Sequence, residues 1–107
     1  MLPSIDFMSL HLYPSSWGKD DTWGAAWIAN HTAASHSIGK PVVVGEFGVP
    51  AGGQSDTYES WLATGTASGT NGMAFWMLCG REDDTSADNG WYPNYDGASK
   101  TDFLLGR

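Results

Sequence analysis

The feature that most constrains the fold is an apolar run at residues 42–47, Val-Val-Val-Gly-Glu-Phe, in which Glu46 is the only charged residue. β-Branched residues without apolar–polar alternation are typical of a strand covered on both faces, as in the parallel sheets of α/β proteins. A carboxylate at the end of such a strand loses hydration energy, unless it lies at the open carboxyl end of the sheet and works there. Glu46 therefore has a stronger claim to a chemical role than any other acid in the chain.

Three apolar segments predict strands, and the segments between them predict helices. The strands are expected at residues 5–12, 41–47 and 72–78. Asp21 or Thr22 is expected to cap the first helix, which Gly39 ends, and Asp56 with Glu59 resembles a capping box for a second helix that ends near Gly65. The predicted apolar faces consist of Trp23, Trp27, Ala34 and Ile38 in the first helix and Tyr58, Trp61 and Leu62 in the second.

This order of strand, helix, strand, helix, strand predicts two parallel βαβ units. It fits either a doubly wound sheet or a slice of a (β/α)₈ TIM barrel. Polar or aromatic residues end every predicted strand, as at the active-site end of a barrel, and no glycine-rich nucleotide-binding turn follows the first strand. The barrel slice is favoured, and since a complete barrel needs about 250 residues, this chain holds under half of one.

The composition excludes several classes of partner and site. A net charge of −7 argues against nucleic acid and against an anionic membrane, and favours a neutral ligand. No apolar run is long enough for a membrane span. A single cysteine, Cys79, allows no internal disulfide or zinc cluster, and is either a buried free thiol or half of a bridge to other sequence. Because a strand is expected within five residues of Met1, with no signal peptide before it, we expect the chain to be part of a longer protein.

Four residues at the predicted strand ends form a candidate site: His11, Tyr13, Glu46 and Trp76. An imidazole and a phenol can aim a carboxylate by hydrogen bonds, and a tryptophan offers a flat face to a sugar ring. Together they would make half of a retaining glycosidase, whose other half is an acid/base carboxyl about 5–5.5 Å away. Structural alternatives remain open: a core histidine, a tyrosine anchoring the turn before Pro14, a core tryptophan, and an ion pair of Glu46 with Lys40 or Arg81.

Four motifs in order resemble the endo-β-1,4-mannanases of glycoside hydrolase family 5. They are His-Leu-Tyr-Pro-Ser-Ser-Trp at 11–17, Gly-Lys-Pro-Val-Val-Val-Gly-Glu-Phe-Gly at 39–48, Gly-Met-Ala-Phe-Trp-Met-Leu-Cys-Gly-Arg at 72–81 and Trp-Tyr-Pro-Asn-Tyr-Asp-Gly at 91–97. The resemblance covers nearly the whole chain. It implies that residues 1–107 are the C-terminal portion of a catalytic barrel, strands six to eight with their intervening helices.

The resemblance also implies a role for each matching residue. Glu46 corresponds to the nucleophile, Tyr13 to the residue hydrogen-bonded to it, His11 to a residue lining the site, and Trp76 to the tryptophan that stacks under the sugar. Cleft-lining positions fall on Trp17, Arg81, Trp91 and Tyr92. The family uses no metal or cofactor, and the resemblance implies a secreted, monomeric full-length enzyme that acts on mannan, galactomannan or glucomannan.

One departure from the family keeps two other functions open. The family's acid/base glutamate lies in an Asn-Glu pair at the end of the fourth strand, and this chain contains no such pair. Without general-acid help, departure of the leaving group is slower by roughly 10²–10⁴-fold. The alternatives are a β-1,4-glucanase (cellulase) of the same family and a non-catalytic carbohydrate-binding protein.

Overall fold

A computed structural model describes residues 3–50 and 53–77 of the chain. Its elements follow one another as β1 (Met8–Leu12), the 3₁₀ helix η1 (Pro14–Trp17), α1 (Trp23–Ser37), β2 (Val42–Phe47), α2 (Gln54–Ser68) and β3 (Gly72–Met73). The predicted alternation of strands and helices is confirmed. The first strand begins at Met8 rather than at residue 5, and the regular part of the third is limited to two residues.

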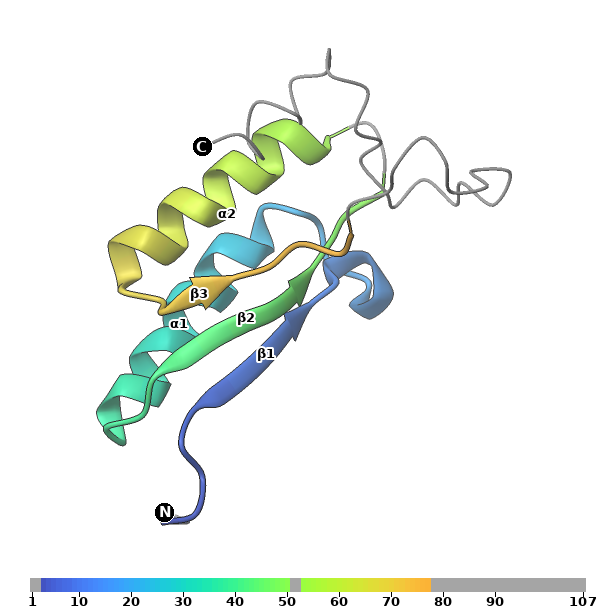
Figure 1. Cartoon of the computed structure of the whole chain (residues 1–107). Helices are drawn as coiled ribbons and strands as arrows, with labels where there is room; N and C mark the ends of the chain where they lie inside the picture. The colour runs from blue at the N-terminus through green and yellow to red at the C-terminus, as the bar shows by residue number, and fades with distance from the viewer. Residues whose placement is uncertain (1–2, 51–52, 78–107) are drawn as a thin grey trace.

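The three strands form a parallel sheet in the order β1-β2-β3 (Figure 1). Right-handed crossovers between strands that follow one another in sequence place both helices on the same face of the sheet. Figure 1 shows α1 and α2 on that common face, with the opposite face of the sheet turned toward the viewer. The α/β class with a parallel sheet is therefore confirmed, as a three-stranded piece rather than a closed barrel.

The core fills the space between the helices and their side of the sheet. The ring of Phe47 from β2 meets Tyr58 of α2 edge-on at 5.1 Å and Trp61 at 5.9 Å between ring centroids. Burial of each large apolar side chain contributes about 1.5–3 kcal/mol, so this aromatic group anchors α2 to the sheet. The remaining buried members of this core are Leu12, Ile28, Val44 and Val49.

The buried face of α1 differs from the predicted one. Ala34 and Ile38 are exposed, and Trp23 and Trp27 are only partly buried. The ring of Trp61 lies so close to Gly24 that a Cβ there would stand 2.4 Å from two of its carbon atoms. Where the backbone of α1 approaches the sheet and α2 closely, only small residues fit. The buried positions of α1 are Gly24, Ile28, Thr32 and Ser35.

The start of α1 directly after Thr22 is confirmed, whereas the start and the end of α2 were predicted wrongly. Asp20 lies before α1 and its Oδ1 accepts a hydrogen bond from the Trp23 amide at 3.1 Å, while Thr22 makes no side-chain cap. α2 begins at Gln54 after Gly53, so Asp56 lies inside its first turn, where a negative charge favours the helix dipole. α2 continues through Gly65 and ends at Gly69, whose φ of 78° is left-handed. The stop of α1 at Gly39, with φ 70°, is confirmed.

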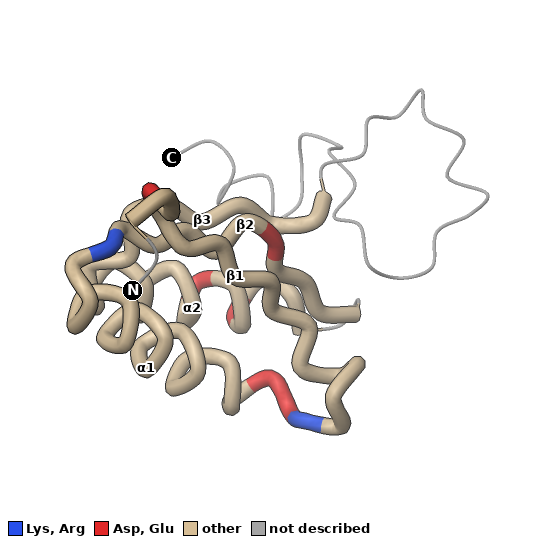
Figure 2. The backbone as a smooth tube through the Cα atoms, turned by 90° about the horizontal axis from the view of Figure 1, so that it is seen from below, with Lys and Arg blue, Asp and Glu red and all other residues tan. Residues whose placement is uncertain are grey.

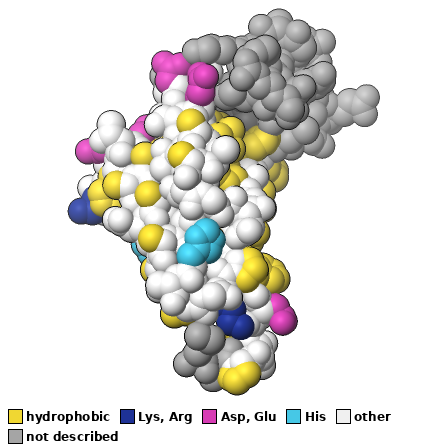
Figure 3. All heavy atoms as spheres, turned by 90° about the vertical axis from the view of Figure 1, so that its left-hand side faces the viewer, with side chains coloured by type: hydrophobic (Ala, Val, Ile, Leu, Met, Phe, Trp, Pro, Cys, Tyr) yellow, Lys and Arg dark blue, Asp and Glu magenta, His cyan; other side chains and the backbone are white. Residues whose placement is uncertain are grey.

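The described residues include few Lys or Arg side chains and no membrane-spanning helix. Lys19, between η1 and α1, and Lys40, between α1 and β2, are the Lys and Arg residues among them, and the blue segments of the tube in Figure 2 lie well apart. On the face drawn in Figure 3, hydrophobic side-chain atoms are scattered among polar ones rather than gathered into one patch. Among residues 3–50 and 53–77, no helix is long and apolar enough to cross a membrane.

Candidate functional site

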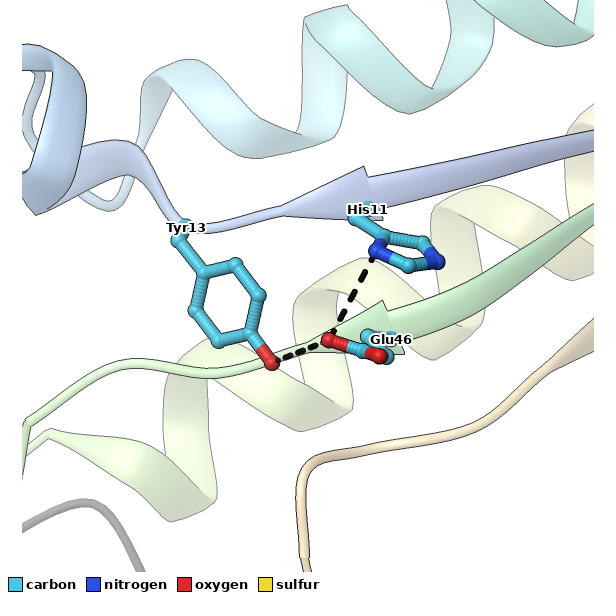
Figure 4. Close-up of polar contacts among 3 residues, drawn as sticks. All are labelled: His11, Tyr13 and Glu46. Atoms are coloured by element: carbon cyan, nitrogen blue, oxygen red, sulfur yellow. Dashed lines mark hydrogen bonds and ion pairs between the residues drawn. The ribbon is translucent and has the colours of Figure 1, made fainter.

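β1 and β2 bring His11, Tyr13 and Glu46 together where the two strands end (Figure 4). Leu10 pairs with Val44, but the next residue, His11, pairs with Glu46, so Gly45 is an extra residue on β2. Side chains alternate between the faces of a strand, and a bulge of one residue resets that alternation. Glu46 therefore shares the open face with His11, and Phe47 returns to the helix-covered core.

The Glu46 carboxylate is held through one of its two oxygens. The Tyr13 hydroxyl donates a hydrogen bond of 2.8 Å to Oε2, and Nδ1 of His11 lies 3.6 Å from the same oxygen. Among the described residues, both polar contacts of Glu46 end on Oε2, which leaves Oε1 turned away from both partners (Figure 4). The Glu46 side chain is 30% exposed, so a ligand on the open face can reach it.

Tyr13 is held as a hydrogen-bond donor by its surroundings. Burial raises its pKa well above the ordinary value of 10, and the hydrogen bond to Glu46 and the negative charge of that carboxylate raise it further. Ionisation of the phenol would place two negative charges 2.8 Å apart. Tyr13 therefore remains protonated and keeps donating to Glu46 throughout the physiological pH range.

Gly45 is a site residue that the sequence interpretation missed. A Cβ at this position would stand 2.8 Å from Oγ of Ser9 and 3.5 Å from Nε2 of His11. The missing side chain thus leaves room for the imidazole over β2. A glycine inside an otherwise β-branched run commonly marks a bulge or a close approach, and that signal was present in the sequence.

Trp76 follows β3 on the same open face as Glu46. Its backbone amide donates a hydrogen bond of 2.8 Å to the Phe47 carbonyl, which continues the pairing between β2 and the segment that follows β3. Phe75 packs against Phe47 and Tyr58 on the helix side, so alternation turns the next side chain to the opposite face. The Trp76 side chain is 43% exposed, in contrast to a core tryptophan.

Trp17 is exposed to a similar degree, 45%, but one side of its ring packs against α1. It lies 5.8 Å from the ring of Trp23, edge-on, and 5.8 Å from that of Trp27, both on α1. The structure therefore brings His11, Tyr13 and Glu46 into contact and seats Trp17 on α1. The predicted residues Arg81, Trp91 and Tyr92, and also Cys79, lie outside the described residues.

Two of the structural alternatives, an ion pair of Glu46 with Lys40 and a core histidine at position 11, are wrong. Glu46 does not pair with Lys40, which precedes β2 at the opposite end of the strand, and Arg81 lies outside the described part. His11 is not a core histidine, because its side chain is 55% exposed. Tyr13 does stand at a turn, since its carbonyl accepts from the Ser16 amide at 3.0 Å, but its hydroxyl also bonds Glu46.

The described residues hold no group of three or more His, Cys, Asp or Glu side chains that could bind a metal ion. A hollow of about 350 Å³ lies near the amino-terminal ends of β2 and β3, opposite to the strand ends that carry Glu46. It is lined by His36, Gly39, Lys40, Pro41 and Asn71. The candidate site is therefore the carboxyl-end group around Glu46.

Comparison with known proteins gives matches in sequence. No family model matches the chain. It is 41% identical over 77 residues to mannan endo-1,4-beta-mannosidase A of Aspergillus aculeatus, an alignment that covers 71% of this chain and 20% of that protein. It is 54% identical over 48 residues to the probable mannan endo-1,4-beta-mannosidase A-1 of Aspergillus terreus, covering 45% of this chain and 12% of that protein.

Solved structures match over almost the whole chain. An endo-1,4-beta-D-mannanase from Thermotoga petrophila superposes with a TM-score of 0.78 at 35% identity, covering 96% of this chain and 33% of that one. The endo-1,4-beta-mannanase from Rhizomucor miehei gives 0.80 at 27% identity, covering 99% and 32%. The chain thus spans about a fifth or less of the length of these curated relatives and about a third of these solved chains.

Proposed function

Because this chain is a relative of the mannan endo-1,4-beta-mannosidases, which are glycoside hydrolases, we propose that it forms part of a retaining enzyme that cleaves internal β-1,4-mannosidic bonds. The proposed place of the chain is the C-terminal portion of a TIM barrel, strands six to eight. Support comes from the sequential order of the parallel strands and from both helices lying on one face. In a closed barrel that face turns outward and the opposite face lines the interior.

The observation that carries the proposal is that, among the described residues, the protein contacts only one oxygen of the Glu46 carboxylate. Tyr13 and His11 both contact Oε2, so Oε1 is the oxygen presented to substrate. In the first step Oε1 attacks the anomeric carbon, a covalent glycosyl–enzyme bond forms, and the glycosidic oxygen departs with a proton. In the second step water attacks the anomeric carbon, gives its proton to the carboxylate that protonated the leaving group, and displaces Glu46 as a carboxylate. The hydrogen bond from Tyr13 holds the carboxylate in a fixed orientation for both steps.

The proton for the leaving group comes from a carboxyl outside the described residues. The polar partners of Glu46 within residues 3–50 and 53–77 are Tyr13 and His11, neither of which is a carboxylic acid. A retaining geometry requires that acid about 5–5.5 Å from Glu46. In the proposed enzyme another part of the barrel supplies it across the open face.

Substrate contacts are proposed for the aromatic and basic residues near the strand ends. Trp76 offers an exposed ring on the same face as Glu46, so it is the proposed platform for the sugar at the cleavage point. Arg81, Trp91 and Tyr92 are the further proposed contacts. The proposed substrate is a neutral mannan polymer, which fits the small number of Lys and Arg residues in the chain. Its proposed hydrolysis requires no cofactor. Such polymers lie outside cells, so the proposed enzyme is secreted, and it acts as a monomer.

The decisive test replaces Glu46 in a full-length protein that carries this sequence. Glu46→Gln removes the nucleophile but preserves the size of the side chain, and hydrolysis of galactomannan should fall by at least about 10³-fold. Glu59→Gln, an exposed position on α2, is the matched control and should retain activity. A fluorinated mannoside that slows the second step should add its glycosyl mass to the wild-type protein and not to Glu46→Gln. Unchanged hydrolysis in Glu46→Gln would overturn the assignment.

The same full-length protein can distinguish the proposed function from two other functions. A β-1,4-glucanase would share the Glu46 chemistry but act faster on carboxymethylcellulose than on galactomannan, so the ratio of the two rates decides the polymer. A non-catalytic carbohydrate-binding protein is favoured by the exposed rings of Trp17 and Trp76. It predicts calorimetric binding of mannohexaose without turnover.

A further inference from the structure

Trp17 closes a group of three tryptophan rings that joins η1 to α1. Its ring meets Trp23 at an interplanar angle of 80° and Trp27 at 41°, each with centroids 5.8 Å apart, and those two rings lie 6.1 Å from one another. Because Trp23 and Trp27 are four residues apart on α1, they form one continuous side of the helix. Trp17 therefore packs across two successive turns of α1.

η1 is a single short turn that depends on its ends for orientation. It begins directly after Tyr13 and consists of Pro14–Trp17, with Pro14 buried. Its local hydrogen bonds include the Ser16 amide to the Tyr13 carbonyl at 3.0 Å, the Gly18 amide to the Ser15 and Pro14 carbonyls, and the Lys19 amide to the Pro14 carbonyl at 3.0 Å. A 3₁₀ turn of this length has weak intrinsic stability. Side-chain packing, at Pro14 on one end and Trp17 on the other, therefore holds it in place.

Tyr13 is the residue that this turn delivers to the site. Its carbonyl belongs to the first hydrogen bond of η1, and its hydroxyl donates to Glu46 Oε2 at 2.8 Å. The direction in which the Tyr13 side chain leaves the backbone is thus coupled to the placement of η1. Displacement of η1 by even an ångström would lengthen or break the contact with Glu46.

We propose that Trp17 is a positioning residue for Tyr13: by packing on Trp23 and Trp27 it holds η1 in place, and through η1 it aligns the hydroxyl that orients Glu46. This inference rests on the proposed function of Glu46 and extends it to a residue that does not touch the carboxylate. It assigns the ring of Trp17 to α1 rather than to the sugar chain. The two roles predict different kinetics.

The test is a double-mutant cycle of Trp17→Ala and Tyr13→Phe in a full-length protein that carries this sequence. Trp17→Ala should lower kcat about tenfold with little change in KM, and in the Tyr13→Phe background it should lower kcat no further. Trp17→Phe, which keeps an aromatic ring on Trp23 and Trp27, should restore most of kcat. If the two effects multiply, or if Trp17→Ala raises KM for long mannan chains at constant kcat, the inference is overturned in favour of direct substrate contact.

A second readout does not require activity. The ultraviolet absorbance of tyrosinate, taken as the difference between a protein and its Tyr13→Phe counterpart, reports the ionisation of Tyr13 beside Glu46, His11 and Tyr58. Trp17→Ala, or the bulkier Trp17→Leu if the alanine variant does not fold, should move that ionisation to lower pH, toward the value of an exposed phenol. An unchanged titration with wild-type folding contradicts the inference. Retained hydrolysis in Glu46→Gln would instead contradict the proposed function.

Discussion

Tyr13 and Glu46 are 33 positions apart in the sequence, and the Tyr13 hydroxyl donates a 2.8 Å hydrogen bond to Oε2 of Glu46. The contact crosses from the end of β1 to the end of β2 and depends on the bulge at Gly45. It assigns different roles to the two carboxylate oxygens, since Oε2 is held by the protein and Oε1 faces the open side of the sheet (Figure 4).

Tyr13→Phe should slow catalysis without weakening substrate binding. A hydrogen bond to a charged group contributes about 1.5–3 kcal/mol, so kcat for galactomannan should fall by roughly 10- to 150-fold while KM changes little. Tyr58→Phe is the matched control, because its hydroxyl accepts from the Val49 amide in the core rather than contacting Glu46. A Tyr13→Phe enzyme with wild-type kcat would show that the hydroxyl does not support the nucleophile.

The raised pKa of Tyr13 predicts a stability change in alkaline solution. The folded protein favours the neutral phenol, so the stabilisation is fully present below the unfolded pKa of about 10 and is lost as the pH rises toward the folded value. The difference in free energy of unfolding between wild type and Tyr13→Phe should therefore narrow progressively above about pH 10. Denaturant titrations of both proteins between neutral and strongly alkaline pH measure it. A constant difference across that interval would contradict the prediction.

Trp76→Ala should remove a stacking face beside Glu46. Aromatic stacking contributes about 0.5–1.5 kcal/mol beyond area burial, so kcat/KM on mannan oligosaccharides should fall by roughly 2- to 10-fold. Trp76→Phe retains a ring and should lose less. Because the side chain is 43% exposed, thermal stability should change little in either variant. A large drop in melting temperature with unchanged kcat/KM would assign Trp76 to packing instead.

Gly24→Ala should destabilise the fold although alanine favours helices. The added Cβ would stand 2.4 Å from carbon atoms of Trp61, a fully buried ring whose Nε1 also donates to the Asp21 carbonyl at 3.1 Å. Overpacking of this kind costs about 1–3 kcal/mol, which exceeds the gain in helix propensity of about 1 kcal/mol. Gly53→Ala, where the nearest atoms lie 3.9 Å away, is the control and should lose less stability, because only the preference for glycine over alanine at the N-cap of α2 opposes it. Equal stability of the two variants by denaturant titration would contradict this account.

Residues 1–107 on their own should neither melt cooperatively nor hydrolyse mannan. In the described sheet β1 and β3 are edge strands, and unpaired edges of parallel strands promote association between chains. The face that carries His11 and Glu46 is also without a covering layer among the described residues. Size-exclusion chromatography and a thermal melt of the purified chain test this. A soluble monomer with a sharp two-state transition would show that the piece folds by itself.

The sequence by itself determined the order of strands and helices, the parallel α/β class and the choice of Glu46. These follow from local patterns: a β-branched run is apolar wherever it folds, and a charged residue at its end stands out in any context. His11, Tyr13 and Trp76 followed from the same reasoning, because the ends of parallel strands meet at one edge of a sheet. Confirmation extends to the meeting of His11, Tyr13 and Glu46, whereas the chemical roles of all four remain predictions.

The tertiary structure alone decided the register at Gly45, the buried face of α1 and the seat of Trp17. Helix periodicity favoured Ala34 and Ile38 as core residues, but Trp61 from α2 occupies the space over Gly24 and sets which side of α1 faces inward. The ring of Trp17 lies on Trp23 and Trp27 because η1 folds back onto α1. Contacts of this kind depend on how close two backbones come and on one-residue shifts in pairing, and neither quantity is encoded in the periodicity of a single segment.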